Sequence, residues 1–259
     1  MVHVPGLVER RRAGRRMRDL IRDREETRGL LIAFEGPDGS GKTTQRKVFK
    51  EWLKGEGIKS VTTKWNSSEL IQPLIKARKA ARALSPEEFS LLHAADFRYR
   101  LDTKVLPALW KGKTVIADRY LFTGLARDAA RGLDLAWLLK VYQPIFWPDI
   151  VFYFSVSPET SSKRIAVDRS PKFYEAGQDI TNIDDPLKSY TTFIGKVIQE
   201  YEALALIFQF VTVDAEQSVY DQHRQIRDLY AQGRRRPWAV WNQEALVDWA
   251  ENNRYRIEN

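Results

Sequence analysis

Short apolar runs alternate with amphipathic stretches along most of the chain. The runs are rich in β-branched and aromatic residues and have the length of β-strands; they are residues 30–34, 58–63, 114–118, 149–156 and 208–215. Strands that alternate with helices need crossover connections, which produce a mostly parallel sheet covered on both faces. The pattern therefore predicts an α/β fold of three layers, with a mostly parallel sheet between two layers of helices.

Helix signals occupy the intervals between the apolar runs. In residues 42–54, apolar side chains recur at helical spacing, and two glycines follow that end a helix. Ser85 and Ser157 are each followed by proline and an acid, the order typical of a helix N-terminus. We expect the helix after Ser85 to run toward Trp110 with a bend or break near Pro107, and a long helix to begin at Asp185.

Composition bounds the class of protein. With 259 residues, of which 43% are hydrophobic, the chain suits one medium domain with extensions. The absence of cysteine excludes disulfides, thiolate catalysis and cysteine-based zinc sites, and the three histidines are too scattered for a metal cage. No apolar run approaches the roughly 18 residues of a membrane span, and the N-terminus lacks the apolar stretch of a secretory signal. We therefore expect a cytoplasmic protein with no membrane contact.

Both ends of the chain differ from its middle. The net charge is +8, and residues 1–28 carry nine arginines against five acids. This basic arm has two interpretations: a contact with nucleic acid or an anionic surface, or a solvated arm that packs on its own or a neighbouring subunit. The interspersed acids favour the second. Residues 234–259 hold three tryptophans and are interpreted as an extension that packs on something. The domain between these ends spans residues 29–233.

The segment FEGPDGSGKTTQ, residues 34–45, fits the phosphate-loop pattern G-x-x-x-x-G-K-[ST] through Gly36, Gly41, Lys42 and Thr43. Its glycines allow backbone N–H groups to surround phosphate oxygens at a helix N-terminus. Lys42 is expected to reach the β- and γ-phosphates of ATP, and Thr43 to bind Mg²⁺. A glycine turn without a ligand is the alternative. The residues predicted to bind ATP are Gly36, Pro37, Asp38, Gly39, Ser40, Gly41, Lys42, Thr43 and Thr44.

Three further segments accompany the loop: LLHAAD (91–96), LPALWKGKTVIADRY (106–120) and PDIVFYFSVSPETSSKRI (148–165). In order and spacing, these segments and the loop resemble the thymidylate kinase family over about residues 30–215. The resemblance implies a P-loop NTPase fold and phosphoryl transfer from ATP to a nucleoside monophosphate. In that family, dTMP and ATP give dTDP and ADP. The resemblance does not cover the basic arm or the tryptophan-containing extension.

The resemblance also implies roles for charged residues near the loop. Asp118 ends a strand at the edge where open α/β sheets bind ligands, and its carboxylate can hold Mg²⁺ directly or through water. Arg119 is expected to clamp the acceptor phosphate in its fork of N–H donors. Asp38 is expected to face the acceptor sugar and the metal region, and Glu35 the water shell of the metal. The alternatives are a surface ion pair for Asp118 and Arg119, and a turn-forming aspartate for Asp38.

A segment at about residues 166–184 interrupts the helical pattern and corresponds to the mobile lid of the family. Phosphoryl transfer needs positive charge near the migrating group and exclusion of water. Arg164 and Arg169 match the lid arginines, whereas Lys163 and Lys172 are as well explained as solvated charges.

The acceptor half of the site departs from the family. Trp65 lies where the family has a short Arg-Glu-Pro or Phe-Pro-Glu element, and His93 replaces a stacking aromatic. Phe97 stands where an arginine often contacts the base, with Arg98 one residue later. Thr123 keeps a hydroxyl, and Arg127 replaces a tyrosine. The predicted acceptor-binding residues are Asp38, Trp65, His93, Phe97, Arg98, Arg119, Thr123 and Arg127. These departures predict that thymidylate is a poor acceptor or is bound by altered contacts.

Two alternatives to a nucleoside monophosphate kinase stay open from the sequence. The first is a kinase of a different phosphorylated or small-molecule acceptor. The second is a P-loop switch whose basic arm grips nucleic acid, which the Asp118–Arg119 pair and the lid arginines do not favour. We expect the protein to form a homodimer.

Overall fold

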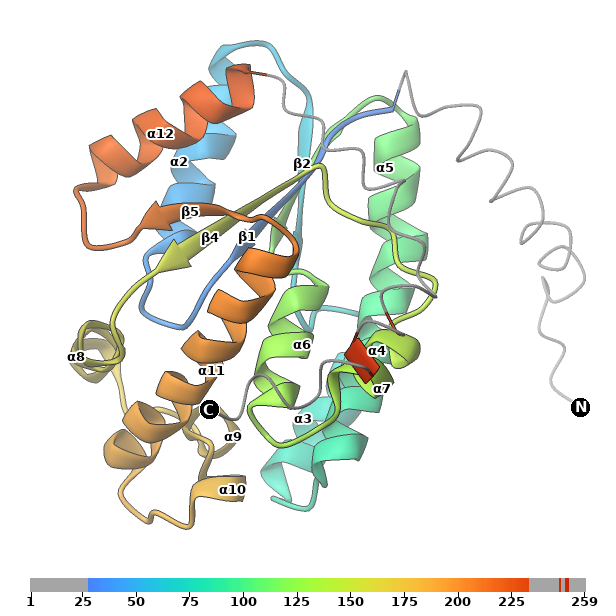
Figure 1. Cartoon of the computed structure of the whole chain (residues 1–259). Helices are drawn as coiled ribbons and strands as arrows, with labels where there is room; N and C mark the ends of the chain where they lie inside the picture. The colour runs from blue at the N-terminus through green and yellow to red at the C-terminus, as the bar shows by residue number, and fades with distance from the viewer. Residues whose placement is uncertain (1–27, 233–246, 248–249, 252–259) are drawn as a thin grey trace, which may run out of the picture.

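A five-stranded sheet runs through the middle of the protein, whose computed structural model describes residues 28–232, Val247, Ala250 and Glu251. All strand pairs are parallel, in the order β2-β3-β1-β4-β5 (Figure 1). The strands are β1 (Leu31–Glu35), β2 (Ser60–Lys64), β3 (Thr114–Asp118), β4 (Ile150–Ser155) and β5 (Val211–Asp214). This arrangement confirms the predicted α/β fold.

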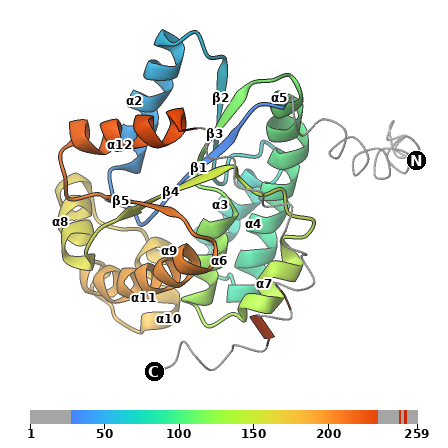
Figure 2. The ribbon, with the colours of Figure 1, turned by 45° about the horizontal axis from the view of Figure 1, so that its top comes forward.

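Helices cover both faces of the sheet, as Figure 2 shows. One face packs against α2 (Lys42–Gly55) and α12 (Val219–Ala231). The other packs against α4 (Pro86–Arg100), α5 (Leu106–Trp110), α6 (Leu121–Ala129), α7 (Leu135–Val141) and α11 (Pro186–Ile207). The remaining helices are α3 (Gln72–Ala80), the π-helix η1 (Leu101–Val105), α8 (Pro158–Asp168), α9 (Phe173–Ala176) and α10 (Gln178–Thr181).

The predicted helix starts are confirmed by their caps. The hydroxyls of Ser85 and Ser157 accept hydrogen bonds from the amides three residues later, each at 3.2 Å, and the Asp185 carboxylate accepts one at 2.8 Å. The helix that begins after Ser85 stays helical as far as Trp110, but it changes from α- to π-helix at residues 101–105. Pro107 lies in the first turn of α5, directly after the π-helix, where its missing N–H costs least.

Two apolar layers hold the helices to the sheet. Between the sheet and α2 lies a phenylalanine cluster in which the Phe34 ring lies 5.7 Å from Phe49 and 5.5 Å from Phe152. On the opposite face, the ring of Tyr153 stacks on that of Tyr201 from α11 at 5.3 Å. Because β1 and β4 are covered on both faces, they are apolar up to their last residues, Glu35 and Ser155, as buried parallel strands require.

The chain ends are described only in part. Arg28 pairs with Asp149 at 2.6 Å, which ties the end of the predicted arm to the start of β4, and residues 1–27 lie outside the described residues. In the predicted C-terminal extension, Val247 and Ala250 are buried in the main core, and Glu251 pairs with Lys140 of α7 at 2.6 Å. The three tryptophans of that extension lie outside the described residues.

A buried ion pair fixes α4 beside β2. Asp96 accepts hydrogen bonds from the Ser68 amide and from Nε of Arg100, both at 2.7 Å, and Arg100 donates to Thr63 of β2 at 3.1 Å. Asp96 and Arg100 are 0% and 1% exposed. The aspartate that ends the LLHAAD segment therefore has a structural role. It holds α4 to β2 through Arg100, and it holds the turn before α3 through the Ser68 amide.

We expect Asp96→Ala to destabilise the protein by about 3–5 kcal/mol, because it leaves the Arg100 guanidinium buried without its counter-ion. Asp102→Ala is the matched control, since its pair with Arg98 is more than a third exposed and such pairs contribute about 0–1 kcal/mol. Urea unfolding of both variants measures the difference. Equal losses of unfolding free energy in the two variants would show that the Asp96–Arg100 pair does not stabilise the contact between α4 and β2.

Candidate active site

The phosphate loop connects β1 to α2, and its glycines have backbone conformations that other residues avoid. Gly36 and Gly39 have φ angles of 140° and 74°. A Cβ atom would lie 2.8 Å from a backbone oxygen at each position, that of Phe154 for Gly36 and that of Ser161 for Gly39. No described side chain caps α2 at Gly41. The loop can thus present backbone N–H groups and the helix N-terminus to an anion.

Lys42 is buried in the loop rather than extended into solvent. Its ammonium donates to the Pro37 carbonyl at 2.7 Å, and the side chain is 5% exposed. Burial, together with the charge of Arg119, lowers the pKa of Lys42 to about 7 despite the nearby carboxylates. A bound polyphosphate would restore the charged form, since negative charge favours the ammonium.

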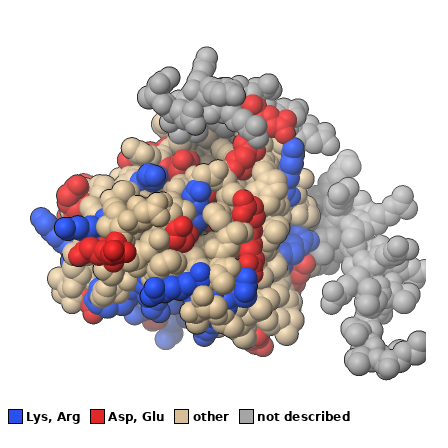
Figure 3. Space-filling view, turned by 90° about the horizontal axis from the view of Figure 1, so that it is seen from below, with Lys and Arg blue, Asp and Glu red and all other residues tan. Residues whose placement is uncertain are grey.

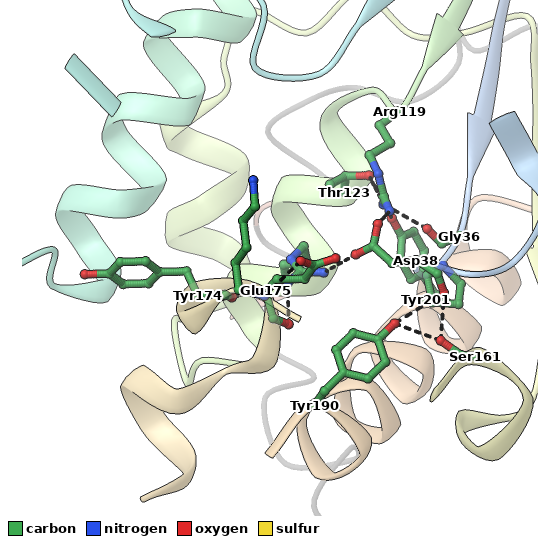
Figure 4. Close-up of polar contacts among 12 residues, drawn as sticks. Gly36, Asp38, Arg119, Thr123, Ser161, Tyr174, Glu175, Tyr190 and Tyr201 are labelled. Carbon is green, nitrogen blue, oxygen red and sulfur yellow. Dashed lines mark hydrogen bonds and ion pairs between the residues drawn. The ribbon is translucent and has the colours of Figure 1, made fainter. Parts of the chain in front are cut away.

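Asp38 holds two arginines at the end of the loop (Figure 4). Arg119 donates to the Asp38 carboxylate at 2.7 Å and to the Gly36 carbonyl at 2.8 Å, and Arg127 lies 3.3 Å from the other Asp38 oxygen. Burial by itself would raise the pKa of Asp38, but Arg119, Lys42 and Arg127 outweigh it and hold that pKa well below its ordinary value. The acid in the loop therefore faces cations.

Arg119 is placed by β3 and by an uncommon backbone conformation. It follows the last residue of β3, its amide donates to Phe34 of β1 at 3.1 Å, and its φ angle is 69°. A non-glycine residue in this region stores strain, which persists only where surrounding contacts hold it. The guanidinium is thereby directed across the end of β1 toward the loop.

Glu35 lies beneath this arginine in a buried hydrogen-bond network. Its carboxylate accepts from the Tyr120 amide at 2.7 Å, from Thr123 at 2.7 Å and from the Tyr201 hydroxyl at 2.9 Å. Burial raises the pKa of Glu35, although these donors and Arg119 oppose the shift. The contacts fix Thr123 below the pocket, and the role of Glu35 at the water shell of a metal stays a prediction.

The donor set at the sheet edge suits Mg²⁺ held mostly by phosphate and water. The Asp118 carboxylate accepts from Nε of Arg46 at 3.1 Å, and Thr43 is exposed at the first turn of α2. Among the described residues there is no cluster of three or more histidine and acidic side chains that could hold a metal alone. Hydroxyl and carboxylate oxygens are the ligands that Mg²⁺ prefers, and one or two of them suffice beside a bound polyphosphate.

A pocket opens beside Asp38 and Arg119, and it has two chemically different ends. It is lined by Asp38, Trp65, Asn66, Lys79, Phe89, His93, Arg119, Thr123, Gly124, Arg127, Asp128, Tyr174 and Glu175. At the end beside the phosphate loop, Asp38 contacts Arg119 and Arg127. At the end formed by α4, aromatic rings predominate, and Lys79 lies beside them. The rings of Trp65 and His93 are parallel within 6° at 5.9 Å, and Phe89 lies 4.2 Å from His93. Such a wall suits a flat base, and the charged end suits a phosphate.

Two predicted acceptor-binding residues lie away from this pocket. Phe97 is 1% exposed and packs edge-on against Tyr120 at 4.8 Å. Arg98 pairs with Asp102 at 3.0 Å and donates to the Pro144 carbonyl at 3.1 Å. The pocket is lined by the other predicted acceptor-binding residues: Asp38, Trp65, His93, Arg119, Thr123 and Arg127. Arg98 turns away because it lies five residues after His93, on another side of α4. Phe97 shares the face of Phe89 and His93, but it lies one turn farther along, where Tyr120 and Tyr142 enclose its ring.

Several lining residues were missed from the sequence. Asp128 could have been noticed as an acid on an otherwise apolar helix, directly after Arg127. No sequence signal distinguishes Lys79 from the other lysines, because α3 meets the pocket only in the folded chain. Tyr174 and Glu175 belong to the predicted lid segment, where the need for positive charge near the phosphates points only to cationic residues.

The predicted lid segment contains α9 and α10, which pack against α11. Arg127 of α6 donates to two backbone carbonyls of α9. Arg164 of α8 donates to the Gly39 carbonyl in the phosphate loop at 3.1 Å. Arg169 is 45% exposed and pairs with Glu175, which lines the pocket, at 2.6 Å. Arg131, in the turn after α6, donates to the Tyr174 carbonyl at 2.6 Å. The segment thus borders the pocket through Tyr174 and Glu175, and the helix before it, α8, contacts the phosphate loop.

Comparison with known proteins agrees with this geometry. A family profile for thymidylate kinase matches residues 34–226, which include the phosphate loop, the pocket and the lid segment. The chain belongs to the thymidylate kinase family. It is 38% identical to the probable thymidylate kinase 2 of Saccharolobus solfataricus over 205 residues, 78% of this chain and 95% of that protein. It is also 30% identical to the thymidylate kinase of Schizosaccharomyces pombe over 207 residues, 79% of this chain and 93% of that protein.

On the face that Figure 3 shows, basic and acidic side chains both lie on the described surface. Within residues 28–232, no helix has the length and apolar character needed to cross a membrane. Any role of the basic arm lies outside the described residues.

Asp128→Asn should stabilise the folded protein by on the order of 1–3 kcal/mol at about pH 7.5. Burial raises the pKa of Asp128 from 3.8 to about 6, although Arg131 opposes the shift. Because the folded pKa is the higher one, the buried carboxylate destabilises the protein above about pH 6, and this cost fades as the pH falls toward 4. The stability gain of the variant should therefore be smaller at about pH 4.5.

Urea unfolding at the two pH values tests this prediction, with Asp228→Asn as the control at an exposed position on α12. The control should change stability by less than about 0.5 kcal/mol at either pH. A loss of stability in Asp128→Asn at neutral pH would contradict the expected cost of the buried charge.

Proposed function

We propose that the protein transfers the γ-phosphoryl group of ATP to the phosphate of a nucleoside monophosphate, with dTMP as the acceptor that the names of its relatives indicate. The observation that carries the proposal is the position of Arg119. Its guanidinium bonds to the phosphate loop through Gly36 and Asp38, and it also lines the adjoining pocket. A cation at this junction can contact the donor and acceptor phosphates at once.

The phosphate loop would hold the ATP. The backbone of residues 36–44 would surround the phosphates, with Lys42 at the β- and γ-phosphates. Thr43 and Asp118 would hold Mg²⁺, with Glu35 behind them, and the ion would neutralise charge on the phosphates when bound. Catalysis would then consist of positioning two anions in line and stabilising the charge that moves between them.

The lid arginines would complete the site. Arg164 already lies against the phosphate loop, and Arg169 lies on the segment that borders the pocket through Glu175. Closure of this segment over ATP would bring Arg169 toward the transferred group and exclude water, which would otherwise compete as the acceptor. We assign Arg164 to the nucleotide and Arg169 to the transition state.

Membership of the thymidylate kinase family does not favour the alternatives of an unrelated acceptor or a nucleotide-gated switch. A coupled assay of ADP release, with MgATP and a panel of nucleoside monophosphates, tests the proposal. Release that requires a nucleoside monophosphate supports the kinase. Slow release that needs no acceptor and is stimulated by nucleic acid would support the switch instead.

We further propose that the protein works in the cytoplasm as a homodimer. The leucines Leu70, Leu74 and Leu91 on or beside α3 and α4 are between 49% and 67% exposed, and a subunit interface would cover them. Sedimentation equilibrium distinguishes a dimer from a monomer, and a mass of one chain at micromolar concentration would rule the dimer out.

Lys42→Ala should lower kcat by about 10²–10³-fold while the protein stays folded, because one full charge near the transferred phosphoryl group is lost. Lys47→Ala is the matched control, as it removes an exposed lysine from the same helix. Steady-state kinetics and thermal unfolding of both variants make the comparison. Near-normal turnover in Lys42→Ala would contradict the assigned site.

Arg119→Ala should chiefly impair use of the acceptor, whereas Arg169→Ala should chiefly lower kcat. Arg119 is held at the end of β3, so its contact exists in the ground state and the transition state alike, whereas Arg169 acts best when the lid is closed. Arg224→Ala on α12 controls for loss of an exposed cation. If both site variants altered only the apparent affinity for ATP, the division of roles would be wrong.

A further inference from the structure

Lys79 places an ammonium group at the aromatic end of the pocket. Its Nζ lies 3.4 Å from Nε2 of His93 and 4.6 Å from the centre of the Phe89 ring. The other ring nitrogen of His93, Nδ1, lies 2.7 Å from the Phe89 carbonyl, which can only accept. Nδ1 therefore carries the hydrogen, and Nε2 accepts from Lys79. One of three N–H groups of the ammonium is used in this way, and the others are available to a ligand.

The histidine keeps this role because it stays neutral. Burial, followed by the charge of Lys79, lowers the pKa of His93 well below its ordinary value. The parallel ring of Trp65 and the close ring of Phe89 fix its plane. His93 thus positions Lys79 and forms part of the aromatic wall at the same time.

Asp128 supplies an acceptor that the described residues leave unused. The residue is 1% exposed and lines the pocket, and neither carboxylate oxygen has a hydrogen-bond partner in the described part of the chain. The Ser90 hydroxyl is near but makes no well-formed bond, and Arg131 directs its donors to Asp179 and to backbone carbonyls. A buried carboxylate without donors calls for a partner, and the pocket is where a ligand can provide N–H groups.

We propose that Lys79 and Asp128 select the base of the acceptor by reading a carbonyl oxygen beside a ring N–H group. This pattern occurs in thymine, uracil and guanine, where Lys79 donates to the carbonyl and Asp128 accepts from the N–H. Cytosine and adenine present the reverse pattern, with an amino group toward the ammonium and a lone pair toward the carboxylate. Both contacts are then repulsive, so the pair selects against these bases as well as for the others.

The inference rests on the proposed function, since it assumes that the pocket holds a nucleoside monophosphate with its phosphate at Arg119. It also accounts for the departures on α4. The donor that Phe97 cannot provide, and that Arg98 directs elsewhere, comes instead from α3. The altered pocket therefore keeps the means to bind a base such as thymine through different residues.

The test compares kcat/KM for dTMP, dUMP, dGMP, dCMP and dAMP in the full-length protein and in three variants. The protein should prefer one or more of the first three acceptors over dCMP and dAMP. Lys79→Met should lower kcat/KM for the preferred acceptor by about 10- to 100-fold and change the last two far less. Because the base lies away from the transferred group, the loss should appear mainly in KM.

Asp128→Asn is the isosteric partner variant. Its amide both donates and accepts, so the preference for bases with a ring N–H should narrow by about 10-fold or more. Lys76→Met is the control, because it removes an exposed lysine from α3 without touching the pocket, and it should leave all five values unchanged. Thermal unfolding of each variant separates lost selectivity from lost folding.

Three outcomes would contradict these proposals. One would overturn the proposed function, and the other two would overturn only the base-reading role of Lys79 and Asp128. Absence of transfer to all five acceptors would overturn the proposed function, and the base-reading role with it. Transfer with a clear base preference that neither Lys79→Met nor Asp128→Asn alters would overturn the base-reading role alone. An equal loss for all five acceptors in both variants would also overturn it, because it would indicate a purely structural contribution.

Discussion

The ion pair between Asp38 and Arg119 is the interaction on which the site depends. The phosphate loop, the end of β3 and the last turn of α6 all bring positive charge to one small volume, through Lys42, Arg119 and Arg127. Without a phosphate present, these cations would repel one another in a region that is largely shielded from water. Asp38 bonds to both arginines and lowers this repulsion, so that the loop, the sheet edge and α6 can be held together before a ligand arrives.

A second network keeps this arrangement from relaxing. Glu35, Thr123 and Tyr201 join β1, α6 and α11 through short hydrogen bonds in the core. Their packing holds the backbone of Arg119 in the left-handed conformation, which an arginine in an isolated chain segment would rarely keep. Buried networks whose members are satisfied are rigid. The charges that would stabilise a moving phosphoryl group are thereby oriented in advance, which is the main contribution that a protein makes to such a transfer.

Helix α6 lines part of the pocket and also contacts α9 of the predicted lid segment. Arg127 of α6 and Arg131 in the turn after it donate to the backbone carbonyls of Tyr174 and Glu175 on α9. Arg127 bonds to Asp38 as well, so one side chain touches both the phosphate loop and the lid segment. A ligand that altered the charge at Asp38 would also change how strongly α9 is held.

Local rules determined much of this protein from its sequence. The strands, the caps at Ser85, Ser157 and Asp185, and the glycine loop depend on neighbours a few residues away, and each appears where its pattern predicts. Arg119 and Asp118 could be placed because the carboxyl ends of parallel strands meet at one edge. Tertiary structure alone decided the acceptor end of the pocket. Arg98 turns away because of its angular position on α4, and Phe97 is enclosed by Tyr120 and Tyr142 one turn beyond His93. Lys79 and Asp128 line the same pocket from helices about fifty residues apart in the chain. Which side chains converge on a cavity depends on how helices pack, and packing is set by contacts between segments that no local pattern records.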